Sequence, residues 1–419
     1  MHRRIRTLGA GLAATASLLA LTACGSGFSG SSSSSSGSAS PSSANKNPLT
    51  VLIGSSGPAE TKAVQTAVAA WSSSSGVKAK VQAASNLPQQ LSQGFAARKP
   101  ADVFYLGADT FASYAKQGSL LAYGDQLKNK SDFYPSLVKN FTYNGKFYCA
   151  PKDFSTLQLE INTDMWKAAG LKDSDVPTTW DQLATVAKKL TTSKHAGLVT
   201  DSQYQRLGAF MAQAGGNLMN DDSTTATVNS AANVKALTYV QQGVKAGWWK
   251  FNKDVGAGWG GEALGKNLAA MTIEGNWIAG TKADYPNLKY KVVPLPKGPS
   301  GAGTLQFTNC WGVAADSKNQ GAALKLVEQL TTAKDQLDFA KAFGVMPSIQ
   351  SAASDWKSLY PQYGAFLDAA SYAKGVPTAV GSADVVTDLN SKLAGLKGLS
   401  DIKGLLDTEQ KNLSAAVAK

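Results

Sequence analysis

Apolar residues in the first third of the chain follow two alternating patterns. Short apolar runs are predicted to be strands, and after each run apolar residues recur at helical spacing, as Val64, Val68 and Trp71 do. The expected strands span residues 49–54, 77–82 and 101–107, and the expected helices span residues 60–74, 87–98 and 109–117. This order indicates a parallel sheet with helices on both faces.

The rest of the chain contains a second block of strands and helices. A hairpin turn is expected at residues 143–146, where Asn144 and Gly145 stand between two apolar stretches. Further helices are expected at residues 162–169, 179–191, 204–214 and 231–246, and further strands at residues 270–274, 289–294 and 305–314. Two such blocks indicate two α/β lobes, whose ligands would bind at the carboxyl ends of strands.

Residues 1–23 have the features of a lipoprotein signal peptide. Three arginines precede an apolar run at residues 8–21, which is too short to span a bilayer. The sequence Leu-Thr-Ala-Cys that ends at Cys24 resembles a bacterial lipobox, in which this cysteine is lipidated. An ordinary secretory signal with a chance cysteine is the alternative. Residues 24–47 contain twelve serines and are expected to form a tether, which would place the protein on the outer face of the cell membrane.

Composition excludes several classes of chemistry. The 419 residues are 43% hydrophobic, which is enough for substantial cores. Without the three signal-peptide arginines the chain has 38 basic and 29 acidic groups, a net charge of +9. Nearly all of this charge is scattered lysine, which favours solvated faces over a nucleic-acid-binding patch. Only two histidines and five arginines occur, so a multi-histidine metal site and arginine-based phosphate recognition are not expected.

Three possible enzyme or nucleotide motifs are discounted. Gly256, Gly258 and Gly261 match the dinucleotide fingerprint but follow no convincing strand. The stretch from Gly260 to Lys266 resembles a phosphate loop but lacks the serine or threonine that binds magnesium. His195 lies in a polar loop without a nucleophile or carboxylate nearby in sequence. We therefore expect no cofactor, no metal and no catalytic histidine.

Four segments in consistent order carry a resemblance to a known family. They are residues 101–109 (ADVFYLGAD), 151–165 (PKDFSTLQLEINTDM), 265–277 (GKNLAAMTIEGNW) and 311–319 (WGVAADSKN). Together they resemble extracellular solute-binding protein family 1, the sugar-binding lipoproteins of ABC importers that include maltose-binding protein. The resemblance covers about residues 48–419.

The resemblance implies an α/β, two-lobed periplasmic-binding-protein-like fold with the ligand cleft between the lobes. Lobe 1 would contain residues 48–149 and 312–365, and lobe 2 would contain residues 150–311 and 366–419. Hinge strands would cross between the lobes near residues 149–155, 307–313 and 363–373.

Two cysteines remain after lipidation of Cys24. Outside the membrane an even pair favours a disulfide, and the alternative is two buried thiols. The family resemblance places Cys149 and Cys310 on adjacent crossing strands, which implies a disulfide in the hinge region. Two free thiols per denatured mature chain would contradict it.

Sugars have polar hydroxyls and apolar C–H faces, so their sites combine aromatic platforms with carboxylates or amides. The expected platforms are Trp259, on a glycine-rich loop expected at residues 256–262, and Trp277. Trp71, Trp166, Trp180 and Trp356 are expected in the core, Trp311 is interpreted as structural, and either role is open for Trp248 and Trp249. The candidate ligand-binding residues are Ser55, Ser56, Glu60, Asp109, Asp153, Tyr204, Gln205, Arg206, Trp259, Glu262, Glu274, Asn276 and Trp277.

Three of these candidates have alternative roles. Asp109 begins a helix and would serve as an N-cap or near-cap residue, and a role in binding sugar hydroxyls is compatible with that. Asp153 would accept hydroxyls or pair with Lys152. Arg206 would contact ligand or form an ion pair between the lobes.

The function expected from these features is a monomeric receptor that traps an oligosaccharide by hinge closure and delivers it to ABC permease subunits served by a separate ATPase. No catalysis is expected. The alternative is a lipid-anchored hydrolase of envelope glycans, with Asp109 and Asp153 as its paired carboxylates. A ligand such as glycerol phosphate is disfavoured by the scarcity of arginine.

Overall fold

The computed structural model describes residues 47–418. The predicted signal peptide, Cys24 and nearly all of the predicted tether lie outside the described residues. The strands are β1 Leu49–Ile53, β2 Ala79–Ala83, β3 Val103–Gly107, β4 Thr142–Tyr143, β5 Lys146–Phe147, β6 Ala150–Thr156, β7 Gln158–Asn162, β8 Ala196–Thr200, β9 Trp249–Phe251, β10 Ala269–Glu274, β11 Tyr290–Val293, β12 Thr304–Val313 and β13 Ala373–Gly375.

The helices cover most of the remaining chain, with short 3-10 turns between them. They are α1 Pro58–Ser75, α2 Leu87–Ala96, α3 Ala108–Lys116, α4 Pro135–Asn140, α5 Thr163–Ala168, α6 Trp180–Leu190, α7 Tyr204–Gln213, α8 Ala231–Lys245, α9 Gly260–Gly265, α10 Thr281–Asp284, α11 Gln320–Leu330, α12 Ala333–Phe343, α13 Ala353–Leu359, α14 Gly364–Asp368, α15 Ser382–Leu393 and α16 Ile402–Val417.

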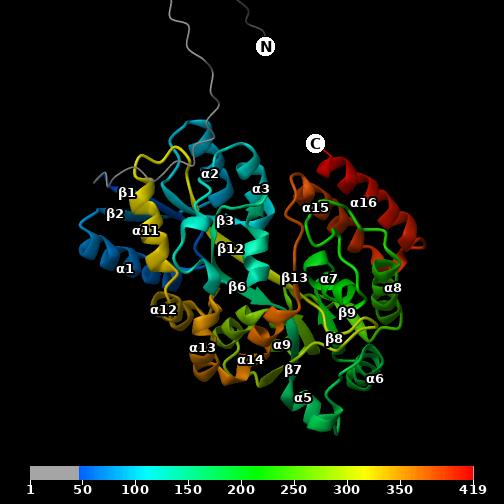
Figure 1. The fold of residues 1–419 in the computed structure, drawn as a ribbon. Helices are drawn as coiled ribbons and strands as arrows, with labels where there is room; N and C mark the ends of the chain where they lie inside the picture. Colours follow the sequence, from blue (N-terminus) through cyan, green and yellow to red (C-terminus); the bar gives the residue numbers. More distant parts are fainter. Residues whose placement is uncertain (1–46, 419) are drawn as a thin grey trace, which may run out of the picture. The chain divides into compact units, whose positions relative to one another are not determined.

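The first sheet has the strand order β13-β12-β3-β1-β2, with β6 also paired to β12. Strands β1, β2 and β3 are parallel, as the strand–helix alternation predicts, whereas β12 joins β3 in the antiparallel direction. Helix α1 packs against α11 and α12, and α3 packs against β3 and β12 (Figure 1). One hydrophobic cluster fills this half, including Trp71, Phe104 and Trp311.

The second sheet has the strand order β11-β7-β10-β8-β9. Strands β8, β9 and β10 are parallel, and β7 runs antiparallel to β10 and to β11. Its core includes Trp166, Trp180, Trp248 and Trp249, with α15 and α16 packed against it. These tryptophans, together with Trp71, Trp311 and Trp356, are buried.

The predicted local structure is confirmed at one place and differs from the observed structure at others. The hairpin at residues 143–146 is confirmed, with Asn144 and Gly145 at positive φ between β4 and β5. The expected loop at residues 256–262 is partly wrong, because α9 begins at Gly260. Strands β7, β8 and β9 were not expected. Strand β7 is fully buried although it contains Gln158 and Glu160, whose polar side chains hide the apolar pattern.

Candidate ligand-binding site

A cavity of about 410 Å³ lies where the first sheet meets the helices that cover the second. Its polar lining includes Asp109 at the start of α3, Asp153 on β6 and Asn309 on β12. Gln205 on α7 and Asn390 on α15 line the opposite side. Helices α3 and α15 contact one another beside the segment that follows β13 (Figure 1). The cavity is therefore formed by residues from both halves of the structure.

Apolar side chains complete the lining. Phe307 of β12 is half-buried, and Val376, Pro377 and Val386 lie on the segment after β13 and on α15. Phe307 also contacts Trp277 edge to face, with ring centroids 5.9 Å apart. Trp277 is 37% exposed, unusually high for such a large apolar side chain in this chain. Apolar surface beside hydroxyls, amides and carboxylates suits a ligand that has both C–H faces and hydroxyl groups.

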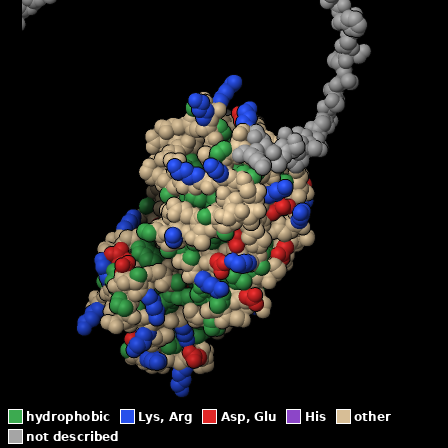
Figure 2. Space-filling model, turned by 90° about the vertical axis from the view of Figure 1, so that its left-hand side faces the viewer, with side chains coloured by type: hydrophobic (Ala, Val, Ile, Leu, Met, Phe, Trp, Pro, Cys, Tyr) green, Lys and Arg blue, Asp and Glu red, His purple; other side chains and the backbone are tan. Residues whose placement is uncertain are grey.

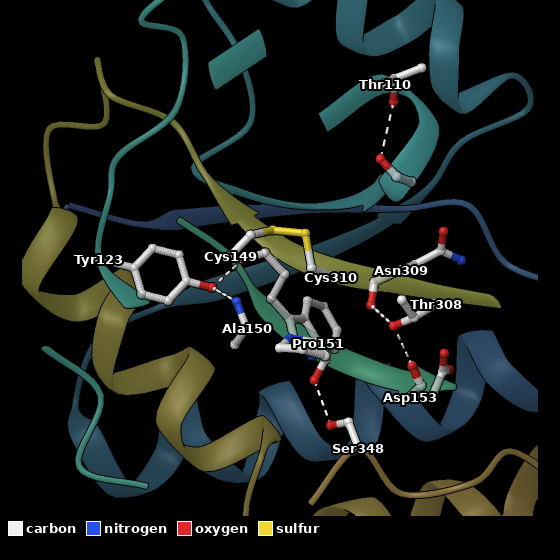
Figure 3. The surroundings of a disulfide bond; sticks show 12 residues. Thr110, Tyr123, Cys149, Ala150, Pro151, Asp153, Thr308, Asn309, Cys310 and Ser348 are labelled. Atoms are coloured by element: carbon white, nitrogen blue, oxygen red, sulfur yellow. Dashed lines mark hydrogen bonds between the residues drawn. A yellow bond between two sulfur atoms is a disulfide. The ribbon is translucent and has the colours of Figure 1, made fainter. Parts of the chain in front are cut away.

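The antiparallel pair β6–β12 forms the floor of the cavity and contains an irregularity. The pairing register shifts between Asn309 and Cys310, so the ladder is interrupted there. Tyr123 bridges the pair Ala150 and Trp311 near this shift: its hydroxyl accepts from the N–H of Ala150, at 2.9 Å, and donates to the carbonyl of Trp311 (Figure 3). Asn309, at the shift, is exposed.

The Cys149–Cys310 disulfide, predicted from the family resemblance, is present next to this irregularity. Its Cα atoms are 5.6 Å apart and both cysteines are fully buried. In Figure 3 Asn309, Thr308 and Asp153 lie on the opposite side of the disulfide from Tyr123. The covalent bond and Tyr123 therefore fix the register of the two strands whose side chains line the cavity.

Asp109 is exposed in the first turn of α3. The N-cap position is Gly107, and no side chain caps this helix, so Asp109 is not the N-cap but occupies the near-cap position in the first turn. A carboxylate in the first turn is nevertheless favourable, because it faces the positive end of the helix dipole. Asp109 is thus available to a ligand in the cavity.

Behind Asp153 lies a buried ionic cluster. Lys152 Nζ contacts Glu60 Oε1 at 3.3 Å and hydrogen bonds to Asp153 Oδ2. Tyr105 donates to Glu60 Oε1 at 3.0 Å, and the N–H and hydroxyl of Ser56 donate to Glu60 Oε2, each at 2.7 Å. Burial works to raise the pKa of Glu60, but Lys152 and these donors hold it below its ordinary value. Glu60 is therefore a buried anion.

A second cluster lies at the end of β10. Arg206 Nη2 binds Glu274 Oε2 at 2.5 Å, and Trp277 Nε1 donates to the same oxygen at 2.8 Å. The guanidinium carbon of Arg206 lies 5.1 Å from the Trp277 ring centroid. Glu274 Oε1 accepts from the N–H of Gly260 at 3.0 Å. Arg206 is thus paired with Glu274 on the second sheet, and this pair fixes the orientation of the Trp277 ring.

Glu160 of β7 lies beside this cluster. Its side chain is fully buried and its Oε2 accepts from the backbone N–H of Glu274 at 2.9 Å. Burial, followed by the carboxylate of Glu274, raises the pKa of Glu160 well above its ordinary value. Glu160 therefore holds a proton to a higher pH than an exposed glutamate does.

The other predicted site residues have mainly local contacts. Tyr204 is fully buried and donates to Asn217 at 2.8 Å. Trp259 is half-buried against the core cluster around α9 and Trp356. Glu262 accepts from the N–H of Gly258 and pairs with Lys266 on the surface. None of these three side chains is part of the cavity lining.

Ser55 and Asn276 also make local hydrogen bonds. Ser55 Oγ donates to the carbonyl of Gly57 at 2.6 Å, within the loop after β1. Asn276 Nδ2 donates to the carbonyl of Gly344 at 2.8 Å, which joins the end of β10 to the segment after α12. These two residues shape the chain near the cavity without forming its lining.

Several cavity residues were missed by the sequence reasoning. Asn390 accepts from the N–H of Tyr204 at 2.7 Å and donates to Gln205 Oε1 at 3.0 Å, so it orients a predicted site residue. Asn390 and Thr387 lie one turn apart on α15, far along the chain from α7. The sequence of α15 has the pattern of an ordinary amphipathic helix, and this pattern does not indicate that Asn390 and Thr387 line a cavity. Phe307 and Asn309 lie in β12, a strand that the sequence predicts at residues 305–314. That predicted strand is the only signal in the sequence that points to these two residues.

A family model described as bacterial extracellular solute-binding protein matches residues 66–366. The chain belongs to this family.

A curated relative in the family is the diacetylchitobiose binding protein DasA of Streptomyces coelicolor. It is 28% identical over 297 residues, which cover 67% of this chain and 68% of that protein. A probable ABC transporter-binding protein of Deinococcus radiodurans is 30% identical over 275 residues, covering 59% of this chain and 62% of that protein. The chain thus spans about two thirds of the length of these relatives.

Solved structures of solute-binding proteins share the fold. An ABC substrate-binding protein from Listeria monocytogenes, in complex with cycloalternan, has a TM-score of 0.77 at 23% identity, covering 89% of this chain and all of the other. The cyclic alpha-maltosyl-1,6-maltose binding protein from Arthrobacter globiformis has a TM-score of 0.78 at 19% identity, covering 88% of this chain and 98% of the other. The predicted two-lobed, maltose-binding-protein-like fold is confirmed.

Figure 2 shows Lys and Arg side chains spread over one face, with Asp and Glu between them. Among residues 47–418, no helix combines the length and apolarity needed to cross a membrane. The described residues also contain no group of three or more His, Cys, Asp or Glu side chains placed to hold a metal ion.

Proposed function

We propose that this chain is a carbohydrate receptor that binds an oligosaccharide in the cavity between its two lobes. The observation that carries the proposal is the lining of that cavity. Carboxylates and amides such as Asp109, Asp153 and Gln205 suit hydroxyl groups, while Phe307 and Pro377 offer apolar surface to C–H faces. Relatives named for diacetylchitobiose and solved with cycloalternan support the same ligand class.

Trp277 is the proposed aromatic platform at the edge of this site. Its orientation depends on Glu274 and Arg206, which we propose as supporting residues. The loop after β1 is held by the hydrogen bonds of Ser55, Ser56 and Glu60. The turn that precedes Trp277 is held by the hydrogen bond of Asn276 to Gly344. Tyr204, Trp259 and Glu262 have contacts that favour structural roles, so we rank them last among the candidates.

The receptor would deliver its ligand to the permease subunits of an ABC importer. A ligand that contacts both lobes favours the closed form, because only closure makes both sets of contacts at once. The permease would then bind the closed monomer, and a separate ATPase would drive release. The lobe boundaries at residues 149, 311 and 365 remain predictions.

We also propose that the protein is anchored outside the membrane. The apolar run at residues 8–21 and the lipobox ending at Cys24 support removal of residues 1–23 and lipidation of this cysteine. The serine-rich residues 24–47 would keep the lobes away from the lipid. The description of the family as extracellular agrees with this location.

A panel of saccharides, read by thermal shift and calorimetry, tests the proposal. Diacetylchitobiose, maltotriose and a cyclic maltosyl-maltose form a suitable set, and glycerophosphocholine is the comparison ligand that is not a saccharide. A ligand at 100 times its Kd should stabilise the folded state by about 2.7 kcal/mol, which raises the Tm by several degrees. Chromatography of the same mixtures should show unchanged saccharide. Turnover would favour the glycan hydrolase, and no shift with any saccharide would reject the carbohydrate receptor.

A further inference from the structure

Lys152 is a buried cation with an unusually complete set of partners. Its side chain is 8% exposed, and its Nζ atom is shared between Glu60 of α1 and Asp153 of β6. The same nitrogen lies 4.4 Å from the ring centroid of Tyr105 and 5.7 Å from that of Phe343. A lysine is seldom buried unless it is paired. This one lies on β6 and joins that strand to α1, β3 and α12 behind the cavity.

The two carboxylates that Lys152 joins are used differently. Both oxygens of Glu60 accept hydrogen bonds, from Ser56 on one side and from Tyr105 and Lys152 on the other. Among residues 47–418, the only hydrogen-bond donor to the Asp153 carboxylate is Lys152, which donates to Oδ2. Asp153 also lines the cavity. Its second oxygen, Oδ1, is therefore available to a ligand.

Fixing one oxygen of a carboxylate fixes the direction of the other. A hydroxyl donor gains most from an acceptor that already has the right orientation, because no side-chain entropy is then lost on binding. The carbonyl of Asp153 is held too, since the Thr308 hydroxyl donates to it at 2.7 Å. Both the main chain and the side chain of Asp153 are therefore held before a ligand arrives.

We propose that Lys152 is a positioning residue for ligand recognition, which fixes Asp153 as an acceptor in the cavity and ties it through Glu60 to the loop after β1. This inference rests on the proposed carbohydrate-binding function. Lys152 itself does not line the cavity, and its side chain is 8% exposed, so it acts through the two carboxylates. Loss of its charge would leave two carboxylates in a buried site, an unfavourable arrangement that uptake of a proton relieves.

The titratable groups that face this site are Glu60, Tyr105, Lys152 and Asp153. Burial raises the pKa of Asp153, and Lys152 opposes this effect. Burial lowers the pKa of Lys152, but Asp153 and Glu60 outweigh burial and raise it. Without the lysine, Asp153 should take up a proton at a higher pH than in the native protein. A protonated Asp153 is a poorer acceptor, so ligand affinity should then depend on pH.

The test compares Lys152→Met with the native protein by calorimetry between pH 6 and pH 8.5, using the saccharide that binds best in the panel. We expect the affinity of Lys152→Met to be at least about 10-fold lower at pH 7. The loss should be larger at pH 6 than at pH 8.5, whereas the native affinity should change little. Lys334→Met is the matched control, because Lys334 also lies between two aspartates but is 78% exposed.

A variant that fails to fold does not end the test. The double variant Lys152→Met/Glu60→Gln has one buried carboxylate, Asp153, in place of two. It should therefore fold, and its affinity for the saccharide should still be lower than that of the native protein. Folded Lys152→Met, or the double variant, with an affinity within twofold of the native value at every pH would overturn the proposal. Failure of the native protein to bind any saccharide would instead reject the proposed function.

Discussion

Phe307 illustrates how a residue gains a role from its position in a strand. It lies on β12 in the one stretch of that strand, Phe307 to Asn309, that is not buried, and it lines the cavity and contacts Trp277 edge to face. The sequence predicted the strand, but the side of the sheet that meets a cavity depends on residues from both lobes. The same limit applies to Asn390, whose partners Tyr204 and Gln205 are far away in the chain.

Phe307→Ala should therefore weaken saccharide binding by roughly 10-fold with little change in Tm, because an apolar contact with the ligand is lost from a half-exposed position. Trp259→Ala is the control, since Trp259 packs against the core around α9 and its loss should lower Tm more than affinity. Calorimetry and thermal unfolding of both variants give the comparison. Equal losses of affinity in the two variants would contradict this placement of the site.

Glu160 makes stability depend on pH. Its pKa in the folded state is raised by burial and by Glu274. Above the ordinary glutamate pKa, the unfolded chain loses this proton while the folded chain keeps it, so stability falls as pH rises through that range. Glu160→Gln, which cannot ionise, should be more stable than the native protein at pH 8. The difference should shrink towards pH 4 in urea unfolding, and an equal difference at both pH values would argue against a protonated Glu160.

At the scale of elements, the strength of the sequence signal decided what was predictable. The first three strands and their helices were found because β1 and β3 are nearly continuous apolar runs. Strand β7 was missed because Gln158 and Glu160 are polar yet buried, with hydrogen bonds that no local pattern indicates. Strand β9 has three residues, too few for a periodic signal. Helix α9 was hidden by its glycines.

The β6–β12 ribbon combines a disulfide, an irregular ladder and cavity-lining side chains. Replacing both Cys149 and Cys310 with serine should destabilise the protein by roughly 2–5 kcal/mol, as is usual when a native disulfide is removed. Affinity at 25 °C should change less than about threefold, because Tyr123 and Thr308 still join the strands. Urea unfolding and calorimetry measure the two effects. Equal stability of the native and double-serine proteins would show that the bond contributes nothing.

At the scale of the whole molecule, the order of four segments predicted the fold better than any single motif did. Fold depends on many residues that are spread along the chain, so the resemblance survives local misassignments such as the missed β7. In the proposed site, ligand identity would depend on a few side chains from loops and helix starts, including Asp109 and Gln205. Their relative positions are set by packing between lobes, which one sequence does not specify.

The disulfide also shows how the two sheets are nested along the chain. All five strands of the second sheet, from β7 to β11, lie between Cys149 and Cys310. The first sheet pairs β3 with β12, about two hundred residues later in the chain. Because contacts between distant residues require long loops to close, we expect the second sheet to form first. A chain that emerges amino end first would thus begin the first sheet early but complete it only after the second sheet has emerged.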